Sequence, residues 1–439
     1  KEGKNRKVAS LQWILTHSFH AKLMAVKRVT QNKGKNTPGV DGVTWNTASQ
    51  KTKAVSSLTR KGYKARPLRR VNIPKANGKT RPLGIPTMTD RAMQALYLMA
   101  LNPVAETTAD DNSYGFRPER CCADAIEQCF IVFGRKPAAQ WVLEADIKGC
   151  FDNISHQWLL DNIPMDKKVL RQWLKAGTIE NSQFSNTIAG TPQGGIISPV
   201  LANLTLDGLE RHIEKACGVI RFKGGQKNTK GQRLKVNFVR YADDFVVSAV
   251  DKPTLQKIVL PAVVAFLKER GLTIQTEKTR VTHIEEGFDF LGQTVRKFRG
   301  LLIIKPSKKS IKAIKRKVFD IIKKSGSLPA DKLIYQLNPV LRGWANYHRY
   351  IISKHVFSRI DNDIYLALWR WAKRRHNTKN QHWIRRKYFK SIDSRNWAFA
   401  AQDGDKVVTL FKMESIRINR FIKVRNKANP FDPEWHPYF

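Results

Sequence analysis

The stretch FVRYADDFVVSAV, residues 238–250, contains two adjacent acidic residues, Asp243 and Asp244, between two apolar runs rich in β-branched residues. Such runs favour extended backbone, so the stretch predicts a strand, a tight turn and a second strand, with both carboxylates at the tip of a hairpin. Adjacent carboxylates repel each other and resist burial, so they favour a bound cation. The alternative is an ordinary solvated turn, because Asp is a common turn residue.

A second acidic position lies upstream, in LEADIKGCFDNISH, residues 143–156, where Asp146 ends an apolar strand. An acid at a strand end that faces the hairpin tip would complete a three-carboxylate site for two Mg²⁺ ions. Such a site suits in-line attack of a 3′-hydroxyl on an α-phosphate. Asp152 is a competing candidate for the third carboxylate, and Glu144 is a weaker one.

The charge of the chain indicates a polyanionic partner. Among 439 residues, 79 are Lys or Arg and 36 are Asp or Glu, which gives a formal net charge of +43. Neutralising phosphates is the main source of nucleic-acid affinity, and an anionic membrane is the rival partner. No apolar run reaches the roughly 18 residues that a membrane span needs. We therefore expect a soluble, cytoplasmic protein of bacterial type, with association to the nucleoid as an option and no membrane partner.

Three segments have periodic patterns, and two of them are basic. Residues 66–86 alternate apolar and basic residues around a central ANG, which predicts a two-stranded ribbon. The run 89–105 predicts a helix with Thr89 as N-cap. Residues 307–325 predict a helix with one apolar stripe and a basic remainder. The basic residues expected to contact nucleic acid on this helix and after it are Lys308, Lys309, Lys312, Lys315, Arg316, Arg342 and Arg349.

Five cysteines, without paired spacing or neighbouring histidines in metal-ligand register, are expected to be reduced thiols. The chain begins at Lys1 without a methionine, which suggests a trimmed or incomplete sequence.

Several ordered motifs resemble the reverse transcriptases of the group II intron maturase family. In chain order they are NTPGVDGVTW, IPKANGKTRPLGIP, DIKGCFD, GTPQGGIISPVLANL, YADD, TEKTRV, FDFLG and LNPVLRGWANYHR. One tetrapeptide would be weak evidence, whereas six or more ordered blocks are specific. The resemblance covers nearly the whole chain.

The resemblance implies that Asp146, Asp243 and Asp244 bind the catalytic metals with help from the backbone of Ile147. The expected cofactor is a pair of Mg²⁺ ions, for which Mn²⁺ can substitute. It further implies that Phe151 lies under the sugar of the incoming nucleotide and excludes a 2′-hydroxyl. An ordinary core aromatic is the alternative for Phe151.

The resemblance assigns four more residues to the nucleotide. Lys75 and Arg81 would bind the triphosphate, and Gln193 would line the pocket of the nascent base pair. Lys278 would protonate the departing pyrophosphate, a role open to a cation whose pKa its surroundings can lower. Plain surface residues and a plain glycine turn are the alternatives at these positions.

The expected fold is α+β, a right-hand polymerase with fingers, a palm with a mainly antiparallel sheet flanked by helices, and an α-helical thumb or maturase domain. The expected division is an N-terminal extension and start of the fingers (1–65), fingers and palm (66–300), thumb (301–382) and a basic C-terminal segment (383–439). That last segment resembles the join to a DNA-binding and endonuclease region. Without further cysteine pairs or clustered histidines, no DNA cutting is expected from the chain as given.

The expected function is RNA-directed DNA synthesis from dNTPs and a primer 3′-hydroxyl, coupled to splicing and retrohoming of the parent intron. Its partners would be group II intron RNA, an RNA template with DNA primer, dNTPs and target DNA. Two alternatives stay open: an RNA-binding splicing cofactor with a vestigial polymerase site, and a related reverse transcriptase of antiviral defence. The intact acids Asp146, Asp243 and Asp244 argue against the first.

Overall fold

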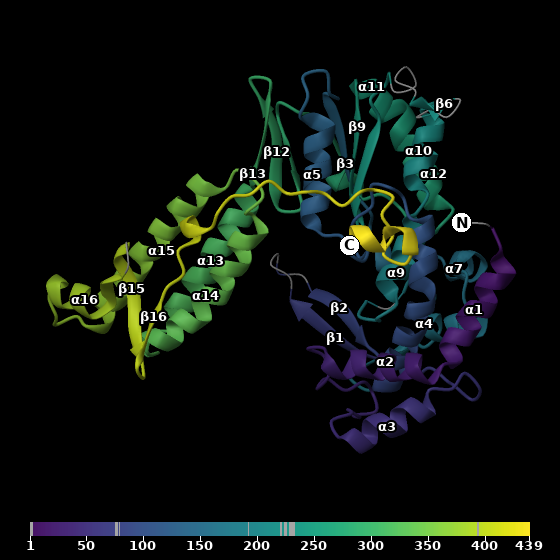
Figure 1. Cartoon of the computed structure of the whole chain (residues 1–439), viewed down its shortest axis with the longest axis horizontal. Helices are drawn as coiled ribbons and strands as arrows, with labels where there is room; N and C mark the ends of the chain where they lie inside the picture. The colour runs from purple at the N-terminus through teal and green to yellow at the C-terminus, as the bar shows by residue number, and fades with distance from the viewer. Residues whose placement is uncertain are drawn as a thin grey trace. The chain divides into compact units, whose positions relative to one another are not determined.

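A computed structural model describes residues 3–74, 78, 80–191, 193–219, 222–223, 226–227, 233–392 and 395–439 (Figure 1). The chain divides into two compact units. Unit 1 comprises Lys1–Ala125, Ala139–Val281 and Val424–Phe439, and unit 2 comprises Ile126–Ala138 and Thr282–Lys423. The mixture of helices and antiparallel strands in both units confirms the α+β class.

A four-stranded sheet carries the acidic motifs, and all of it but the end of its edge strand belongs to unit 1. Its strand order is β10-β3-β9-β8, with β3 (Trp141–Asp146) and β8 (Asn237–Tyr241) each antiparallel to β9 (Asp244–Ala249), and β10 is Arg280–His283. The predicted strand, turn and strand around the two aspartates is thereby confirmed. A second sheet has the order β2-β1-β4-β5. Its strands are β1 (Leu68–Pro74), β2 (Thr80–Ile85), β4 (Thr178–Glu180) and β5 (Gln183–Ser185), and the antiparallel pairing of β1 with β2 confirms the predicted ribbon.

The helices of unit 1 pack around one apolar core. They are α1 (Asn5–His17), α2 (Phe19–Gln31), α3 (Ala48–Ser57), α4 (Met88–Thr108), α6 (Cys150–Asn153), α7 (His156–Asn162), α8 (Lys167–Leu174), α9 (Ser198–Leu206), α10 (Leu209–Ala216), α11 (Lys252–Thr254) and α12 (Leu260–Lys268). A π-helical turn, Leu255–Val259, joins α11 to α12, the short strands β6 (Phe222–Lys223) and β7 (Gln226–Lys227) pair, and α5 (Cys122–Phe133) runs from unit 1 into unit 2.

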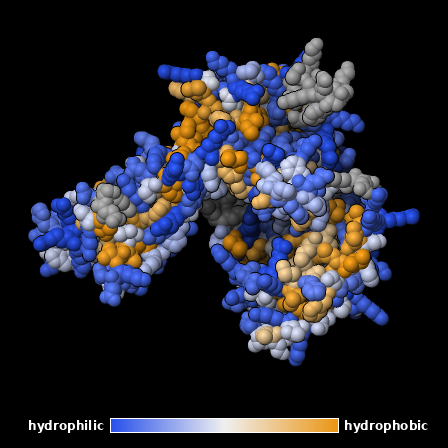
Figure 2. Space-filling model, in the orientation of Figure 1, coloured by the Kyte–Doolittle hydropathy of each residue, from blue (hydrophilic) through white to orange (hydrophobic). Residues whose placement is uncertain are grey.

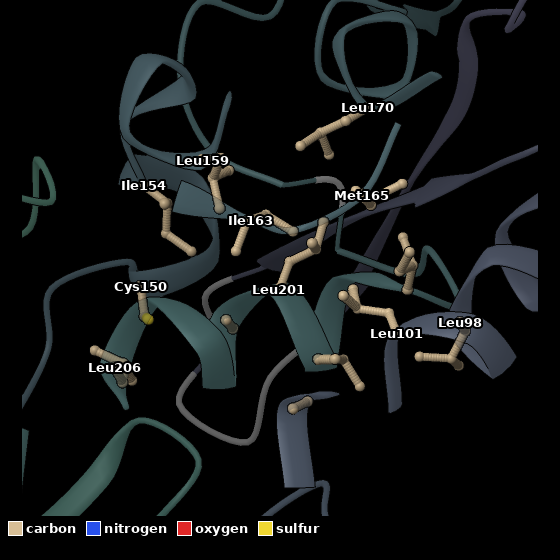
Figure 3. Close-up of a cluster of buried hydrophobic side chains, with 14 of the residues drawn as sticks. Leu98, Leu101, Cys150, Ile154, Leu159, Ile163, Met165, Leu170, Leu201 and Leu206 are labelled. Carbon is tan, nitrogen blue, oxygen red and sulfur yellow. The ribbon is translucent and has the colours of Figure 1, made fainter. Parts of the chain in front are cut away.

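Helix α4 is the centre of this core, because apolar side chains cover it on all sides and most of its residues are buried. Figure 3 shows Leu98 and Leu101 of α4 beside Leu201 of α9, with Cys150 and Ile154 nearby. Burial of these side chains fixes the backbone on which the acidic motifs stand.

The expected N-cap of α4 was wrong by two positions. The cap is Thr87, whose side chain accepts a hydrogen bond from the amide of Asp90, and Thr89 lies inside the helix. The carboxylate of Asp90 accepts a hydrogen bond from the Thr87 hydroxyl in return. An N-cap side chain bonds the amide two or three residues later. Thr87 does so with Asp90, and the reciprocal bond favours Thr87 over Thr89 as the cap.

Unit 2 combines a helical bundle with two antiparallel sheets. The sheets are β11-β12-β13 and β14-β15-β16. The strands are β11 (Phe288–Phe290), β12 (Gln293–Phe298), β13 (Leu301–Pro306), β14 (Phe389–Ile392), β15 (Arg395–Asp403) and β16 (Lys406–Thr409), and the helices are α13 (Lys308–Lys324), α14 (Ala330–Tyr347), α15 (Lys354–Arg375) and α16 (Gln381–Tyr388).

Helix α13 confirms the predicted amphipathic helix after residue 307. Ser307 caps it, and Ile314, Val318 and Ile322 are its buried stripe. The same core continues past the helices, because Phe389, Phe399 and Met413 belong to it. The sheet β14-β15-β16 was not anticipated from the sequence.

A segment near the C-terminus completes a buried network of unit 1. The side chain of Arg120 is 1% exposed and forms an ion pair with Glu106 at 3.2 Å. Its other nitrogen donates hydrogen bonds to the carbonyls of Ala428, at 2.7 Å, and Asn426, at 3.4 Å. The amide of Val424 donates to Asp124 at 2.8 Å. Residues separated by about 300 positions therefore satisfy each other's buried polar groups.

Arg240 of β8 makes a buried ion pair in unit 1, and its removal should destabilise that unit. Its fully buried guanidinium pairs with Asp207 and donates to the Asn203 side chain and the carbonyl of Ala242. Burial raises the pKa of Asp207 to about 6, and Arg240 opposes that shift. We expect Arg240→Met to lower the free energy of unfolding, measured by urea denaturation, by about 3–5 kcal/mol, because Asp207 then stays buried without its partner.

The control for this prediction is Arg211→Met. The Arg211 side chain is 68% exposed, lies 3.9 Å from Asp110 and donates a hydrogen bond to the carbonyl of Thr108 at 3.2 Å, so the loss of these exposed contacts should cost less than about 1 kcal/mol. Equal effects of both substitutions would contradict the importance of the buried pair.

Gly115 touches the turn between β8 and β9, and a methyl group there should strain it. A Cβ at this position would lie 2.3 Å from the backbone nitrogen of Ala242 and 2.9 Å from the carbonyl carbon of Tyr241. Backbone cannot move aside as a flexible side chain can, so we expect Gly115→Ala to lower the free energy of unfolding by about 1–3 kcal/mol. Gly326→Ala, whose Cβ would meet no atom within 4 Å, should change the free energy by less than about 0.5 kcal/mol. An unchanged unfolding curve for Gly115→Ala would refute the close approach.

Candidate active site

The three acidic residues of the two motifs meet at one end of the sheet β10-β3-β9-β8. Asp146, the last residue of β3, is the register partner of Asp244, the first residue of β9. Directly opposite residues of an antiparallel pair lie on the same face, so these two carboxylates are neighbours. Asp243 lies in the two-residue turn, next to Ala242 with φ of 58°. Short hairpin turns require this left-handed backbone, which alanine adopts at a cost.

The carboxylates of the turn titrate as members of a crowded acidic group. Desolvation by the surrounding protein and repulsion from Asp243 and Asp146 together raise the pKa of Asp244 to about 6. The residue still keeps part of its surface exposed to solvent. Burial also raises the pKa of Asp243, as does Asp146, whereas Arg81 and Lys278 lower it. The site is thus an electrostatically unfavourable cluster of negative charge that additional cations would relieve.

Lys278 supplies one such cation. Its ammonium group donates to Asp146 Oδ2 at 2.5 Å, from the 3₁₀ turn Thr276–Lys278. The hydrogen bond to Asp146 raises the pKa of Lys278, and Asp244 and Asp243 add to that shift. Lys278 is therefore a full cation at neutral pH in this arrangement, with a pKa opposite in direction to the lowered one expected of a proton donor.

Ile147 anchors the end of β3. Its side chain is 2% exposed and it forms an isolated bridge with Ile274. The carbonyl of Asp146 accepts a hydrogen bond from the amide of Gln275 at 2.8 Å, and the amide of Lys148 donates to Thr273 at 2.9 Å. These contacts hold the segment of Lys278 beside the acids.

The donor set fits a hard divalent cation in its chemistry, because carboxylate and carbonyl oxygens are the ligands that Mg²⁺ prefers. Asp146, Asp243 and Asp244 supply such oxygens, and their mutual repulsion favours a cation. In the described part of the chain, however, no three acidic, histidine or cysteine side chains already converge as a metal-ion cage. The Lys278 ammonium group instead pairs with Oδ2 of Asp146.

The basic ribbon contributes Arg81, an exposed residue of β2. It is close enough to Asp243 to lower that residue's pKa. The structure therefore brings Arg81 toward the acidic cluster. Lys75, its predicted companion, lies outside the described residues.

Phe151 lies half-buried on α6, one position after the buried Cys150. Its ring makes an edge-to-face contact with the ring of Phe116, with centroids 6.2 Å apart. Phe116 is 47% exposed and has a φ of 59°. An exposed aromatic residue in left-handed backbone is uncommon and often marks a functional position.

Gln193 and the two competing acids also have defined places. The side-chain amide of Gln193 donates to both carboxylate oxygens of Asp152, at 3.1 and 3.0 Å. Asp152 is thereby engaged with Gln193. Glu144 lies within β3, opposite Val246 of β9 and two residues before Asp146.

The predicted basic face of unit 2 divides into two groups. Four of its residues are exposed on α13: Lys308, Lys309, Lys312 and Arg316. The other three have intramolecular contacts. Lys315 pairs with Asp363 at 2.8 Å, the Arg342 guanidinium lies over the Phe411 ring at 4.5 Å, and Arg349 lies over the Tyr350 ring at 5.6 Å.

Sequence reasoning missed Gly115 and Phe116. Both lie in the segment NSYGFRPER, residues 112–120, and Ser113 bridges to Arg240 of β8. The signal available was a glycine followed by an aromatic residue and an arginine in a loop, which alone does not indicate contact with the hairpin.

Three protein-family models match this chain. The model described as reverse transcriptase (RNA-dependent DNA polymerase) matches residues 73–295. The group II intron, maturase-specific domain matches residues 311–389, and the N-terminal domain of reverse transcriptase matches residues 1–58.

Individual relatives point the same way. Group II intron-encoded protein LtrA of Lactococcus lactis is 32% identical over 328 residues, covering 62% of this chain and 54% of the relative. Protein YkfC of Escherichia coli is 34% identical over 301 residues, covering 62% of this chain and 79% of the relative. The putative COX1/OXI3 intron 2 protein of Saccharomyces cerevisiae is 28% identical, covering 62% and 36%.

The chain spans about half the length of the Lactococcus protein. Across the described residues, no helix is both long enough and apolar enough to cross a membrane. On the match of the polymerase model to half of its residues, and of the maturase model to most of α13–α16, the chain belongs to the reverse transcriptase (RNA-dependent DNA polymerase) family and carries a group II intron maturase-specific domain.

Proposed function

We propose that the chain is an RNA-directed DNA polymerase of a group II intron, which extends a primer 3′-hydroxyl with dNTPs and also binds the parent intron RNA during splicing and retrohoming. The observation that carries this proposal is the meeting of Asp146, Asp243 and Asp244 at one sheet end, inside the part of the chain that matches the polymerase family. The proposed partners are intron RNA, a primed RNA template, dNTPs and target DNA.

The proposed architecture is that of a right hand. The ribbon β1–β2 would belong to the fingers, the sheet β10-β3-β9-β8 to the palm and the helices α13–α15 to the thumb. The proposed ranges are 1–65 for the N-terminal extension and start of the fingers, 66–300 for fingers and palm, 301–382 for the thumb and 383–439 for a basic C-terminal segment.

Two Mg²⁺ ions are the proposed cofactor, held by Asp146, Asp243, Asp244 and the backbone carbonyl of Ile147. When bound, such ions lower the pKa of the attacking hydroxyl and stabilise charge on the leaving pyrophosphate. Burial, together with repulsion from Asp243 and Asp146, raises the pKa of Asp244, which supports this assignment because a bound cation stabilises the ionised carboxylate.

The remaining residues would bind and orient the nucleotide. Arg81 would bind phosphate oxygens. Its lowering of the pKa of Asp243 supports this role, because it indicates proximity to the acids, and a guanidinium binds phosphate well. Phe151 would exclude a 2′-hydroxyl, with its ring supported by Phe116. Lys278 would neutralise the acids before nucleotide binds. It would donate a proton to the pyrophosphate only after release of the hydrogen bond to Asp146 that raises its pKa.

The basic surface would bind RNA. Figure 2 shows many hydrophilic side chains on the visible face, and the net charge of +43 means that basic residues outnumber acidic ones. The exposed Lys308, Lys309, Lys312 and Arg316 of α13 offer adjacent charges for phosphates. Binding should weaken steeply as salt concentration rises.

The first test of the proposed activity is primer extension on poly(rA) annealed to oligo(dT), with dTTP and Mg²⁺. We expect Asp243→Ala to reduce synthesis by more than about 100-fold, since removing a metal ligand should cost at least as much as removing its supporting residues. RNA binding, measured by filter retention, should be unchanged.

Asp161→Ala is the matched control, because Asp161 is an exposed residue of α7. Substantial synthesis by Asp243→Ala would contradict the assignment of Asp243 as a metal ligand. Tight RNA binding by wild type without any synthesis would favour the splicing cofactor instead.

A second test concerns sugar selection. We expect Phe151→Ala to reduce discrimination of dTTP over UTP, measured as the ratio of kcat/KM values, by roughly 10- to 100-fold. The reason is that the truncated side chain leaves room for a 2′-hydroxyl. Phe184→Ala, which truncates a 55% exposed ring of β5, should leave the ratio unchanged, and an unchanged ratio in both variants would place the sugar gate elsewhere.

A further inference from the structure

The backbone of the loop that carries Gln193 is fixed on one side by the α6 segment. The amide of Thr191 donates to the carbonyl of Phe151 at 2.6 Å, and the amide of Gly190 donates to the carbonyl of Ile154 at 2.8 Å. A Cβ on Gly190 would lie 2.5 Å from the carbonyl oxygen of Phe151. The loop therefore lies against α6 without space between them.

The same loop is fixed on its other side by β2. The carbonyl of Gln193 accepts a hydrogen bond from the amide of Gly84 at 2.7 Å. Gly194 has a φ of +113°, and a Cβ there would lie 2.6 Å from the carbonyl oxygen of Gly84. Because backbone contacts hold Thr191 on one side and Gln193 and Gly194 on the other, the side chain of Gln193 is the part that can still turn.

Asp152 determines how that side chain turns. The Gln193 Nε2 atom lies 3.1 Å from Asp152 Oδ1 and 3.0 Å from Oδ2. An ionised carboxylate only accepts hydrogen bonds, so the amide must present its NH₂ group to Asp152 and turn its carbonyl oxygen away. Asp152 itself is held by its neighbours, since Cys150 and Ile154 on either side are 2% and 0% exposed.

We propose that Asp152 is a positioning residue for nucleotide selection, which holds the Gln193 amide in one orientation and leaves Gln193 Oε1 as an acceptor for a donor group of the nascent base pair. The inference rests on the proposed function, because it gives Gln193 a place beside the incoming nucleotide. It replaces the alternative in which Asp152 is a metal ligand.

The expected effect lies in nucleotide binding. Without Asp152, the amide of Gln193 must be ordered when each nucleotide binds, and ordering one such side chain weakens binding by about 3- to 10-fold. We therefore expect Asp152→Ala to raise the KM for dTTP by that factor with kcat nearly unchanged. Asp152→Asn should lie between Asp152→Ala and wild type, because its carbonyl oxygen still accepts from the amide but its NH₂ group no longer excludes the reversed orientation.

The test is a double-mutant cycle in steady-state primer extension on poly(rA)–oligo(dT) with dTTP. The proteins are wild type, Asp152→Ala, Asp152→Asn, Gln193→Ala and the double variant Asp152→Ala/Gln193→Ala. If Asp152 acts through Gln193, the double variant has the KM of Gln193→Ala alone.

Asp161→Ala is again the control, and here it is closely matched. Asp161 accepts two hydrogen bonds from the Gln157 side chain, both of 2.9 Å, on the exposed face of α7. The Asp161→Ala variant removes the same type of carboxylate–amide contact at a site away from the loop of Gln193. Its KM and kcat should therefore equal those of wild type. If Asp152→Ala melts at a lower temperature than wild type, the nearly isosteric Asp152→Asn carries the same cycle.

Three results would overturn the inference. Multiplicative KM effects in the double variant would show that Asp152 acts independently of Gln193. A fall in kcat by more than about 100-fold that persists in the Gln193→Ala background would place Asp152 at the metals. No synthesis by wild type would overturn the proposed function and this inference with it, whereas synthesis with either of the first two results overturns the inference alone.

Discussion

The register between β3 and β9 is the constraint on which the site depends. Because Asp146 stands opposite Asp244, the end of one strand and the start of the other bring two carboxylates to the same face, and the two-residue turn adds Asp243. A slip of one residue would separate Asp146 from Asp244 and turn Asp146 to the opposite face of the sheet. Val142, Leu143 and the valines of β9 are buried on both faces of this sheet, and their packing holds the register that forms the acidic cluster.

Local negative charge is concentrated at this site in a chain whose total charge is strongly positive. The buried pair of Arg240 and Asp207 lies directly behind the turn, since Arg240 also donates to the carbonyl of Ala242. One rigid, internally neutralised layer thus supports a second layer whose charges are left unbalanced. The buried ion pair stabilises the backbone behind the turn, and the repulsion among the acids of the turn remains where a substrate or ion can relieve it.

Much of this organisation could be predicted from the sequence, and the exceptions have physical reasons. Apolar runs rich in β-branched residues predicted the hairpin, because such runs are typical of buried strands, and alternation of apolar and basic residues predicted the ribbon. The pattern could not predict that Asp152 contacts Gln193 or that Phe116 contacts Phe151, since these contacts join segments separated in the sequence. It also could not tell that Lys315 already pairs with Asp363.

The α4 cap shows a smaller limit. Two threonines precede the apolar run, and only the reciprocal bond with Asp90 distinguishes Thr87 from Thr89.

The contacts of Arg120 have a consequence for biosynthesis. This buried guanidinium needs the carbonyls of Asn426 and Ala428, which are translated more than 300 residues after it. At about 5–20 residues per second, roughly 15 to 60 s pass between the two events on the ribosome. During that interval all of unit 2 is synthesised, while Arg120 lacks the two carbonyls that accept its hydrogen bonds in the complete fold. Unit 1 can thus form its full set of buried hydrogen bonds only after unit 2 has been translated.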